Sequence, residues 1–216
     1  MIRLWQLLDS AFPAGSFTHS GGLEAAWQSG EVASDAQLQA YLRESLWHAG
    51  HSLLPLVSAA HREPRRFDEL DGLCDAMLTN AIANRASRAQ GRAVVAACAR
   101  IWPSEALSAL ESTARRGCGH YAPALGALLA ACRLTLDDAQ RLFLFTGTRG
   151  VCAAAVRLGI VGPYRAQRLQ HECLESIDDV IRRCGALSVD ECAQTAPLVD
   201  LLQSTHDRLY SRLFQS

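Results

Sequence analysis

The stretch TLDDAQRLFLFTGTRGVCAAAVRLG, residues 135–159, decides the fold of this chain. It opens with Thr135-Leu-Asp-Asp138, an acceptor side chain followed by acids, which is typical of a helix start because the helix dipole favours negative charge there. The residues that follow, from Phe143 to Leu158, are nearly all apolar or small. A helix that is apolar around most of its surface is buried. We therefore expect the central buried helix here, ended by Gly159.

Helical patterns continue outward from this stretch. Ser34-Asp-Ala-Gln37 is typical of a capping box, and an amphipathic helix should follow it through about Gly50. In a later helix the apolar residues recur at helical spacing, so that Asp68, Glu69 and Asp71 should face water. These patterns predict further helices that pack around the central one.

The composition favours the same fold class. The chain has 35 Ala and 31 Leu but only 10 Val and 6 Ile, so a sheet would have little to be built from. Small residues are dense over 81–99, which predicts a closely packed helix. Neither a linker nor a repeat divides the sequence. We expect residues 1–216 to form one single-domain all-α bundle of roughly ten helices, with a partly flexible N-terminal loop and C-terminal tail.

The charged residues exclude several classes of function. All 21 basic residues are Arg, so the chain offers no phosphate-binding, Schiff-base or general-base lysine. The net charge is −1, and the Arg residues form no basic stripe of the kind that nucleic acids need. We expect no nucleic-acid partner.

Cysteine usage and hydropathy point to the cytoplasm. The eight cysteines are scattered and contain no C-x-x-C pair, which favours reduced core cysteines. The apolar run at residues 4–8 is too short for a signal-peptide core. The longest uncharged run, residues 117–132, has 16 residues and is short of a membrane span. We expect a cytoplasmic protein with no membrane partner.

One group near the N-terminus has the residue types of a hydrolase triad: Asp9, Ser10, His19 and Ser20. A nucleophile elbow needs a strand–turn–helix context, which a helical chain does not supply. The alternative is a turn-rich loop in which Ser20 or Asp9 caps helices and Phe12 and Phe17 anchor the loop to the core. We favour the loop and assign no catalytic residue.

Two pairs of side chains have metal-ligand character. His48 and His51 are three residues apart on an expected helix, and Cys118 and His120 offer a thiolate and an imidazole. Neither pair has a third or fourth ligand nearby in sequence. A histidine satisfied by a protein partner is the commoner state, so we expect no tight metal site and no cofactor.

Three arginines, Arg85, Arg88 and Arg92, share one face of the helix expected over 81–99. Composition alone favours a solvated face over an interface. The tail is different, because residues 206–216 crowd Arg, Tyr and Phe, the types that dominate binding hot spots.

The leucines at 198, 201, 202, 209 and 213 should continue a helical stripe into the tail. Two interpretations follow from this pattern. The tail is either a last helix that packs on its own bundle or a segment that orders on contact with a partner.

Four separated motifs resemble signatures of the urease accessory protein F family. They are LLDSAFPAGSFTHSGGLE at 7–24, NRASRAQGR at 84–92, AAAVRLGIVGP at 153–163 and PLVDLLQSTHDRLYSRLFQS at 197–216. Within them, residues 9–24 are the Gly-rich N-terminal signature, and residues 206–216 are the C-terminal tail expected to bind a partner. Because the motifs occur in the expected order, the resemblance covers nearly the whole chain.

The resemblance implies an all-α homodimer without enzymatic activity. It would join two other accessory proteins, the D protein (also called H) and the GTPase G, on apo-urease. There it would help deliver nickel and promote carbamylation of the active-site lysine, with GTP hydrolysis gating the step. The residues that the resemblance assigns to the D protein are Tyr210, Arg212, Leu213 and Phe214. Those that it assigns to the GTPase or the dimer are His19, Ser20, Glu24 and Arg85. The rival hypothesis to this scaffold is a nickel-binding chaperone that acts through its histidines.

Overall fold

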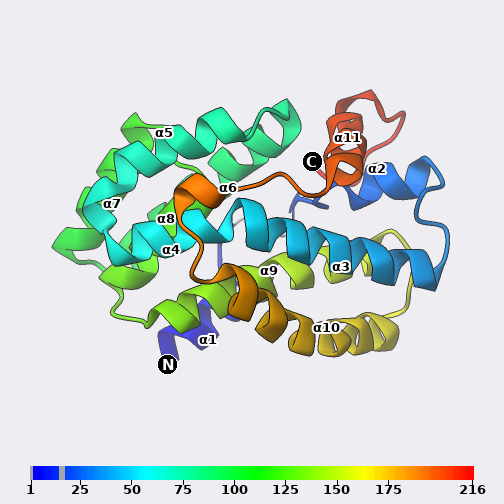
Figure 1. Cartoon of the computed structure of the whole chain (residues 1–216), viewed down its shortest axis with the longest axis horizontal. Coiled ribbons are helices and arrows are strands. Elements are labelled where there is room, and N and C mark those ends of the chain that lie inside the picture. Colours follow the sequence, from blue (N-terminus) through cyan, green and yellow to red (C-terminus); the bar gives the residue numbers. More distant parts are fainter. Residues whose placement is uncertain (1, 15–17) are drawn as a thin grey trace.

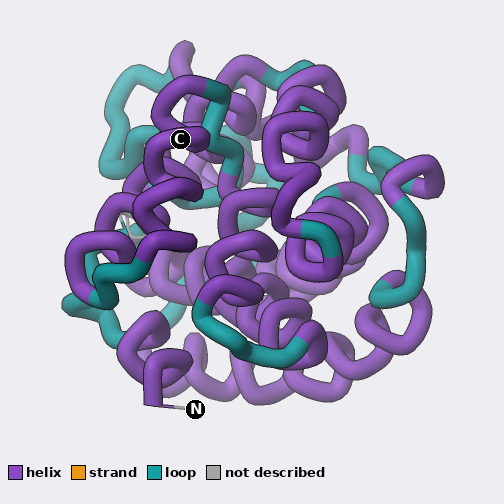
Figure 2. The backbone as a smooth tube through the Cα atoms, turned by 90° about the vertical axis from the view of Figure 1, so that its left-hand side faces the viewer, coloured by secondary structure: helices purple, strands orange, loops and turns teal. Residues whose placement is uncertain are grey.

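The computed structural model describes residues 2–14 and 18–216, and all regular structure in that part of the chain is helical (Figure 2). The predicted all-α fold is confirmed. None of the described helices is long and apolar enough to cross a membrane. The α-helices, labelled in Figure 1, are α1 (Ile2–Leu8), α2 (Leu23–Gln28), α3 (Asp35–Ser52), α4 (Leu54–Arg62), α5 (Phe67–Met77), α6 (Ala81–Ile101), α7 (Glu105–Arg116), α8 (Tyr121–Ala131), α9 (Leu136–Arg157), α10 (Pro163–Cys184) and α11 (Pro197–Ser204). Short 3-10 turns are η2 (Pro64–Arg66), η3 (Val189–Glu191) and η4 (His206–Arg208).

Two of the predicted helix starts are confirmed by their side chains. Ser34 accepts a hydrogen bond from the Gln37 amide at the start of α3, and Thr135 forms a capping box with Asp138 at the start of α9. Such caps satisfy amide groups that have no partner inside the helix. Both are local in sequence, which is why they can be recognised from it.

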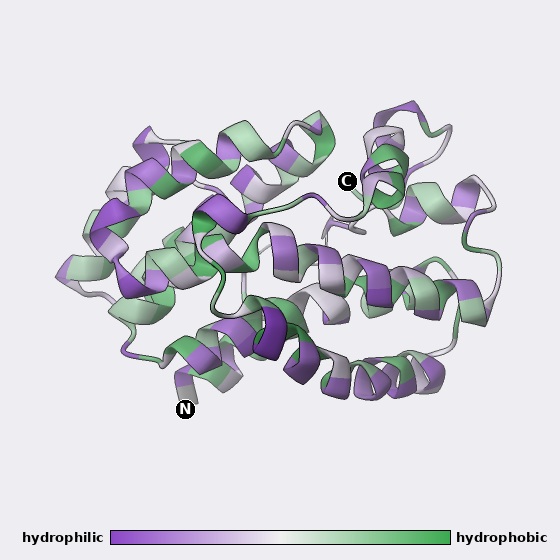
Figure 3. Cartoon of the chain, viewed as in Figure 1, coloured by the Kyte–Doolittle hydropathy of each residue, from purple (hydrophilic) through white to green (hydrophobic). Residues whose placement is uncertain are grey.

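The core has two hydrophobic clusters, and α9 runs through both. Leu142 and Leu144 belong to the larger cluster, which surrounds α8 and α4, whereas Val151 and Ala155 belong to a smaller one with α2, α3 and α10. α10 packs along α9 with its apolar seam and turns its polar residues outward, as the purple side of this helix in Figure 3 shows. α9 therefore links the two halves of the core.

The most deeply buried helix is α8, not the α9 helix that we expected at the centre. Eight consecutive residues of α8, 122–129, are buried, while α9 keeps exposed positions such as Arg141 and Gly147. Gly126 permits this packing because a Cβ there would lie 2.2 Å from the carbonyl oxygen of Val57 on α4. Pro123 fits in the first turn of α8, where its missing N–H is tolerated.

The expectation that Asp71 faces water is wrong. Asp71 is 2% exposed, and its two carboxylate oxygens accept the amides of Gly119 at 2.8 Å and of His120 at 2.7 Å. The carboxylate thus holds the loop between α7 and α8 against α5. Asp68 and Glu69 are exposed as expected.

Candidate functional site

The N-terminal signature and the C-terminal tail, expected as separate features, lie against each other at one end of the molecule. In Figure 1 the red tail runs beside the blue α2. The backbone amide of Gln215 donates to the carbonyl of Thr18 at 2.8 Å, and that of Ser20 donates to the carbonyl of Ser216 at 2.6 Å. We call residues 18–24 together with residues 206–216 the terminal junction. The signature residues 15–17, including Phe17, lie outside the described part of the chain.

The turn that leads into α2 depends on two glycines. Gly21 and Gly22 have φ values of 62° and 87°, in the left-handed region that glycine adopts without strain. A Cβ on Gly22 would also lie 2.9 Å from the Tyr41 hydroxyl and 3.0 Å from Cβ of Gln203 on α11. The Tyr41 hydroxyl donates to the Gly21 carbonyl at 2.6 Å. The Gly-Gly pair thus allows α2, α3 and α11 to meet closely.

Glu24 is the centre of the terminal junction. Its side chain, in the first turn of α2, is 1% exposed. Oε1 accepts the amide of Leu213 at 2.6 Å, and Oε2 accepts the amide of Phe214 at 3.2 Å and Nε2–H of His206 at 3.1 Å. Because the carboxylate only accepts, His206 must donate from Nε2. Glu24 therefore fixes both the backbone path of the tail and the orientation of the His206 ring.

His19 and Ser20 add a second layer of contacts. Nδ1 of His19 lies 2.6 Å from the Ser216 hydroxyl, and the Ser20 hydroxyl donates to the Ser216 carbonyl at 2.9 Å. Burial lowers the pKa of His19, and the neighbouring His206 and Arg85 side chains lower it further. His19 is therefore neutral near pH 7.

The Ser–His–Asp chain weighed for a hydrolase does not form among the described residues. Ser20 directs its hydroxyl to the Ser216 carbonyl, and His19 bonds the Ser216 hydroxyl instead of Ser20. Asp9 accepts the amide of Ala11 within its own turn. These residues serve the loop and the junction, as the alternative interpretation expected.

An exposed charged rim surrounds the junction. Asp207 accepts from Arg85 at 2.9 and 3.1 Å and from Arg212 at 3.2 Å. The hydrogen bond from Arg85 is the main reason that the pKa of Asp207 is lowered. On the same face of α6, Arg88 pairs with Asp75, and Arg92 donates to the carbonyl of Gly117. Arg85 and Arg92 are exposed, as the solvated interpretation expected. Each of the three arginines of the face has a partner within the chain.

The expectation that the leucine stripe continues as a helix into the tail is wrong. α11 ends at Ser204, and the hydroxyls of Ser204 and Thr205 bond the carbonyls of residues 201 and 202. Beyond η4, the Glu24 carboxylate accepts the amides of Leu213 and Phe214, which would bond to backbone carbonyls if the helix continued. Leu198 and Leu201 are 69% and 61% exposed, so they do not face the core. The tail docks on its own bundle, as one of the two interpretations proposed, but not as a helix.

The four tail residues assigned to partner binding separate into two groups. Phe214 is 6% exposed, and the Arg157 guanidinium lies over its ring at 4.3 Å. Tyr210 is fully exposed and Leu213 is 59% exposed, while the Arg212 side chain is half exposed at the rim. The structure therefore brings all eight sequence-assigned residues to one end of the molecule, with Phe214, Glu24 and Ser20 buried beneath the others.

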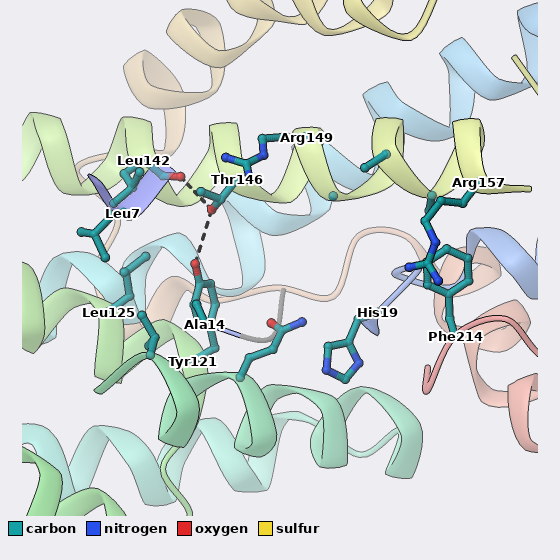
Figure 4. Close-up of a pocket in the computed structure, with 15 residues that line it drawn as sticks. Leu7, Ala14, His19, Tyr121, Leu125, Leu142, Thr146, Arg149, Arg157 and Phe214 are labelled. Atoms are coloured by element: carbon teal, nitrogen blue, oxygen red, sulfur yellow. Dashed lines mark hydrogen bonds between the residues drawn. The ribbon is translucent and has the colours of Figure 1, made fainter. Parts of the chain in front are cut away.

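A pocket lies beside the junction (Figure 4). His19 and Phe214 line one end of it, with Arg157 over the Phe214 ring. At the other end the Tyr121 hydroxyl lies 3.4 Å from Oγ1 of Thr146. Burial raises the pKa of Tyr121, so its hydroxyl stays protonated. Because the docked tail supplies part of the wall, displacement of the tail would open this end of the pocket.

The two metal-ligand pairs have different surroundings. Nδ1 of His48 accepts the amide of Thr195 at 3.2 Å, and the His51 ring stacks on Trp47 with 6.2 Å between centroids. No third ligand joins these two histidines among the described residues. Cys118 and His120 instead lie together with Asp75, a residue that the sequence did not single out.

Comparisons with known proteins give a consistent result. The UreF family model matches residues 32–174. Urease accessory protein F of Oryza sativa subsp. indica is 37% identical over 216 residues, covering 97% of this chain and 83% of the relative. The protein of that name from Arabidopsis thaliana is 36% identical and covers 98% and 91%, and UreF of Rhizobium etli is 30% identical and covers 100% and 96%. This chain belongs to the UreF family of urease accessory proteins.

Proposed function

We propose that this chain is a non-catalytic scaffold in urease maturation. It binds the D accessory protein, also called H, and the GTPase G, and presents them on apo-urease, where nickel is the cargo of the assembled complex. Family membership supports the role in urease maturation. The observation that carries the scaffold role is the terminal junction, where Tyr210, Arg212 and Leu213 face solvent above a buried hydrogen-bonded base.

The composition of this exposed surface suits a protein partner. Tyr and Arg supply large contact area and planar donors, and they are enriched among binding hot spots. Leu198 and Leu201 on α11 add apolar area that the bundle leaves exposed. Glu24 holds the backbone of residues 213 and 214 in place, which lowers the conformational entropy lost on binding. We therefore assign Tyr210, Arg212 and Leu213 to direct contact with the D protein and Phe214 to support from inside.

We assign the other end of the rim to the GTPase or to a second copy of the chain. Arg85 is the exposed member of this set, whereas Glu24 and Ser20 are buried and act through the positions of their neighbours. In this proposal the chain is a cytoplasmic homodimer that regulates GTP hydrolysis by the G protein. The proposed regulation is tested by measuring the rate of GTP hydrolysis by the G protein, with and without the assembled complex.

The assembly is tested by co-expressing the chain with D and G proteins and measuring the mass of the complex by light scattering during size exclusion. A stable complex with two copies of each protein is the expected result. A lone monomer in the presence of both proteins would contradict the scaffold.

The surface is tested by the double substitution Tyr210→Ala with Arg212→Ala. Loss of two hot-spot side chains should weaken D-protein binding roughly 30-fold or more, because each costs on the order of 1–2 kcal/mol or more. Tyr164→Ala is the matched control, since Tyr164 on α10 is 89% exposed. Both variants should keep wild-type helicity by circular dichroism. Unchanged binding of the double variant would remove the tail from the proposed interface.

A further inference from the structure

Three potential metal ligands from separate parts of the chain meet between α5, α6 and the loop before α8. Asp75 lies near the end of α5, and Cys118 and His120 lie in the loop. One ligand atom from each side chain lies within 4.8 Å of the other two, and no other group of three such residues in the described chain does so. The three residue types together supply a carboxylate oxygen, a sulfur and an imidazole nitrogen.

The backbone that carries these ligands is fixed from two sides. Asp71 holds the amides of Gly119 and His120, and Gly119 has a φ of 70° that suits glycine. Gly91 on α6 lets the loop approach, because a Cβ there would lie 2.2 Å from the Gly119 carbonyl oxygen. These contacts therefore fix the position of the loop that carries Cys118 and His120 relative to α5 and α6.

The ligand side chains also have supporting hydrogen bonds. Ser87 Oγ lies 3.1 Å from Nδ1 of His120, and Asn84 donates to Asp75 Oδ1 at 2.9 Å. Arg88 also pairs with Asp75. Metal ligands commonly have partners of this kind, which orient the ring and the carboxylate.

We propose that Asp75, Cys118 and His120 bind one divalent transition-metal ion. A thiolate, an imidazole and a carboxylate suit ions of borderline softness such as Ni²⁺ or Zn²⁺ and disfavour Mg²⁺ and Ca²⁺. The His120 ring is fully buried, whereas Asp75 and Cys118 are partly exposed, so an ion enters from their side. Three ligands leave a coordination position for water or another donor.

Binding requires a rearrangement of one proton on the His120 ring. At present Nε2 donates to Asp75 Oδ1 at 3.0 Å, because the carboxylate can only accept. The ion takes the place of that proton, and the neutral ring then carries its hydrogen on Nδ1 and donates to Ser87. The Cys118 thiol releases its proton when it binds as the thiolate. Ser87 can serve both forms because a hydroxyl both donates and accepts.

The experiment is a titration of the untagged, reduced, full-length chain with Ni²⁺, and with Co²⁺ as a spectroscopic probe. One ion per chain and a thiolate-to-metal charge-transfer absorption band are expected. Cys118→Ser should remove the band and weaken binding at least tenfold. Cys192→Ser, the matched control at the other partly exposed cysteine, should change neither. Ser87→Ala should weaken binding roughly 10-fold to 100-fold, as loss of a partner to a metal-bound histidine does.

Three results would each overturn the site. The first is that the wild-type chain binds no metal ion. The second is that Cys118→Ser keeps both metal binding and the charge-transfer band, and the third is that His48→Ala loses binding. Circular dichroism of each variant separates loss of the site from loss of the fold. The titration uses the chain alone, so its outcome is independent of the scaffold function proposed above.

Discussion

The α8 core and the terminal junction both join segments that are distant in sequence, but they use different interactions. Residues 122–129 of α8 are buried among apolar side chains, and Gly126 lets the α4 backbone approach. In the junction, Glu24 and a set of backbone groups hold the tail by hydrogen bonds, with Phe214 as its main apolar anchor. The comparison teaches that the core sets stability, whereas the junction sets the shape of a surface.

The largest effect on stability is expected from a substitution in the core around α8. Leu128→Ala removes a fully buried side chain of α8 and leaves a cavity, so the free energy of unfolding should fall by about 2–5 kcal/mol. Leu213→Ala, at an exposed leucine of the tail, should change it by less than about 0.5 kcal/mol. Urea denaturation followed by circular dichroism measures both. Equal effects would show that the core and the tail are not energetically distinct.

A smaller effect is expected when the junction is broken at its centre. Glu24→Gln replaces an acceptor-only carboxylate by an amide, which leaves at least one of its three donors without an acceptor and costs about 1–3 kcal/mol. Hydrogen exchange of the Leu213 and Phe214 amides should accelerate far more than that of the α8 amides. Uniform acceleration would mean that the junction and the core open together.

Acid should loosen the junction before it affects the core. The pKa of His19 is lowered in the folded chain, so the unfolded chain binds a proton there more readily. The contribution of neutral His19 to the stability of the folded chain is therefore fully present above about pH 6.5 and falls as the pH drops toward the lowered pKa. Tryptic cleavage at Arg208 and Arg212 should therefore become faster from pH 7 to pH 5, relative to a reference peptide. His19→Asn should reduce this dependence, and an unchanged pH profile in that variant would assign it elsewhere.

The smallest effect belongs to the rim of the junction. Asp207→Asn removes two exposed ion pairs, and such pairs each contribute about 0–1 kcal/mol and are screened by salt. The free energy of unfolding should fall by less than it does in Glu24→Gln in low salt, and by less still in 1 M NaCl. A larger loss would mean that the rim, and not Glu24, holds the tail.

Local features of the fold could be predicted from the sequence, and distant contacts could not. The caps at Ser34 and Thr135 involve residues three positions apart, so the sequence displays them directly. The sequence does not mark α8 as the most buried helix, because a uniformly apolar run has no periodicity that identifies its environment. The burial of Asp71 cannot be predicted from its own helix, because the amides that it binds lie nearly 50 residues away.

The candidate site shows the same division. The residue types in the signature and the tail indicated two surfaces for partners, yet no pattern connects Glu24 with the amides of Leu213 and Phe214. Asp75, likewise, is 45 residues from His120 and lies on α5, whereas His120 lies in the loop before α8. Only the structure brings such residues together, since helix packing and not sequence spacing decides which side chains meet.

The hydrogen bonds of the terminal junction have a consequence for the order of folding. They close loops of more than 180 residues. The helices that α8 contacts most, α4 and α6, lie much nearer to it in sequence. Loop closure on this scale is slow, and a chain made from its N-terminus gains the partner of Glu24 only when synthesis reaches the tail. The junction is therefore among the last parts to form. A protein that recognises it selects chains in which everything between residues 24 and 206 has already been made.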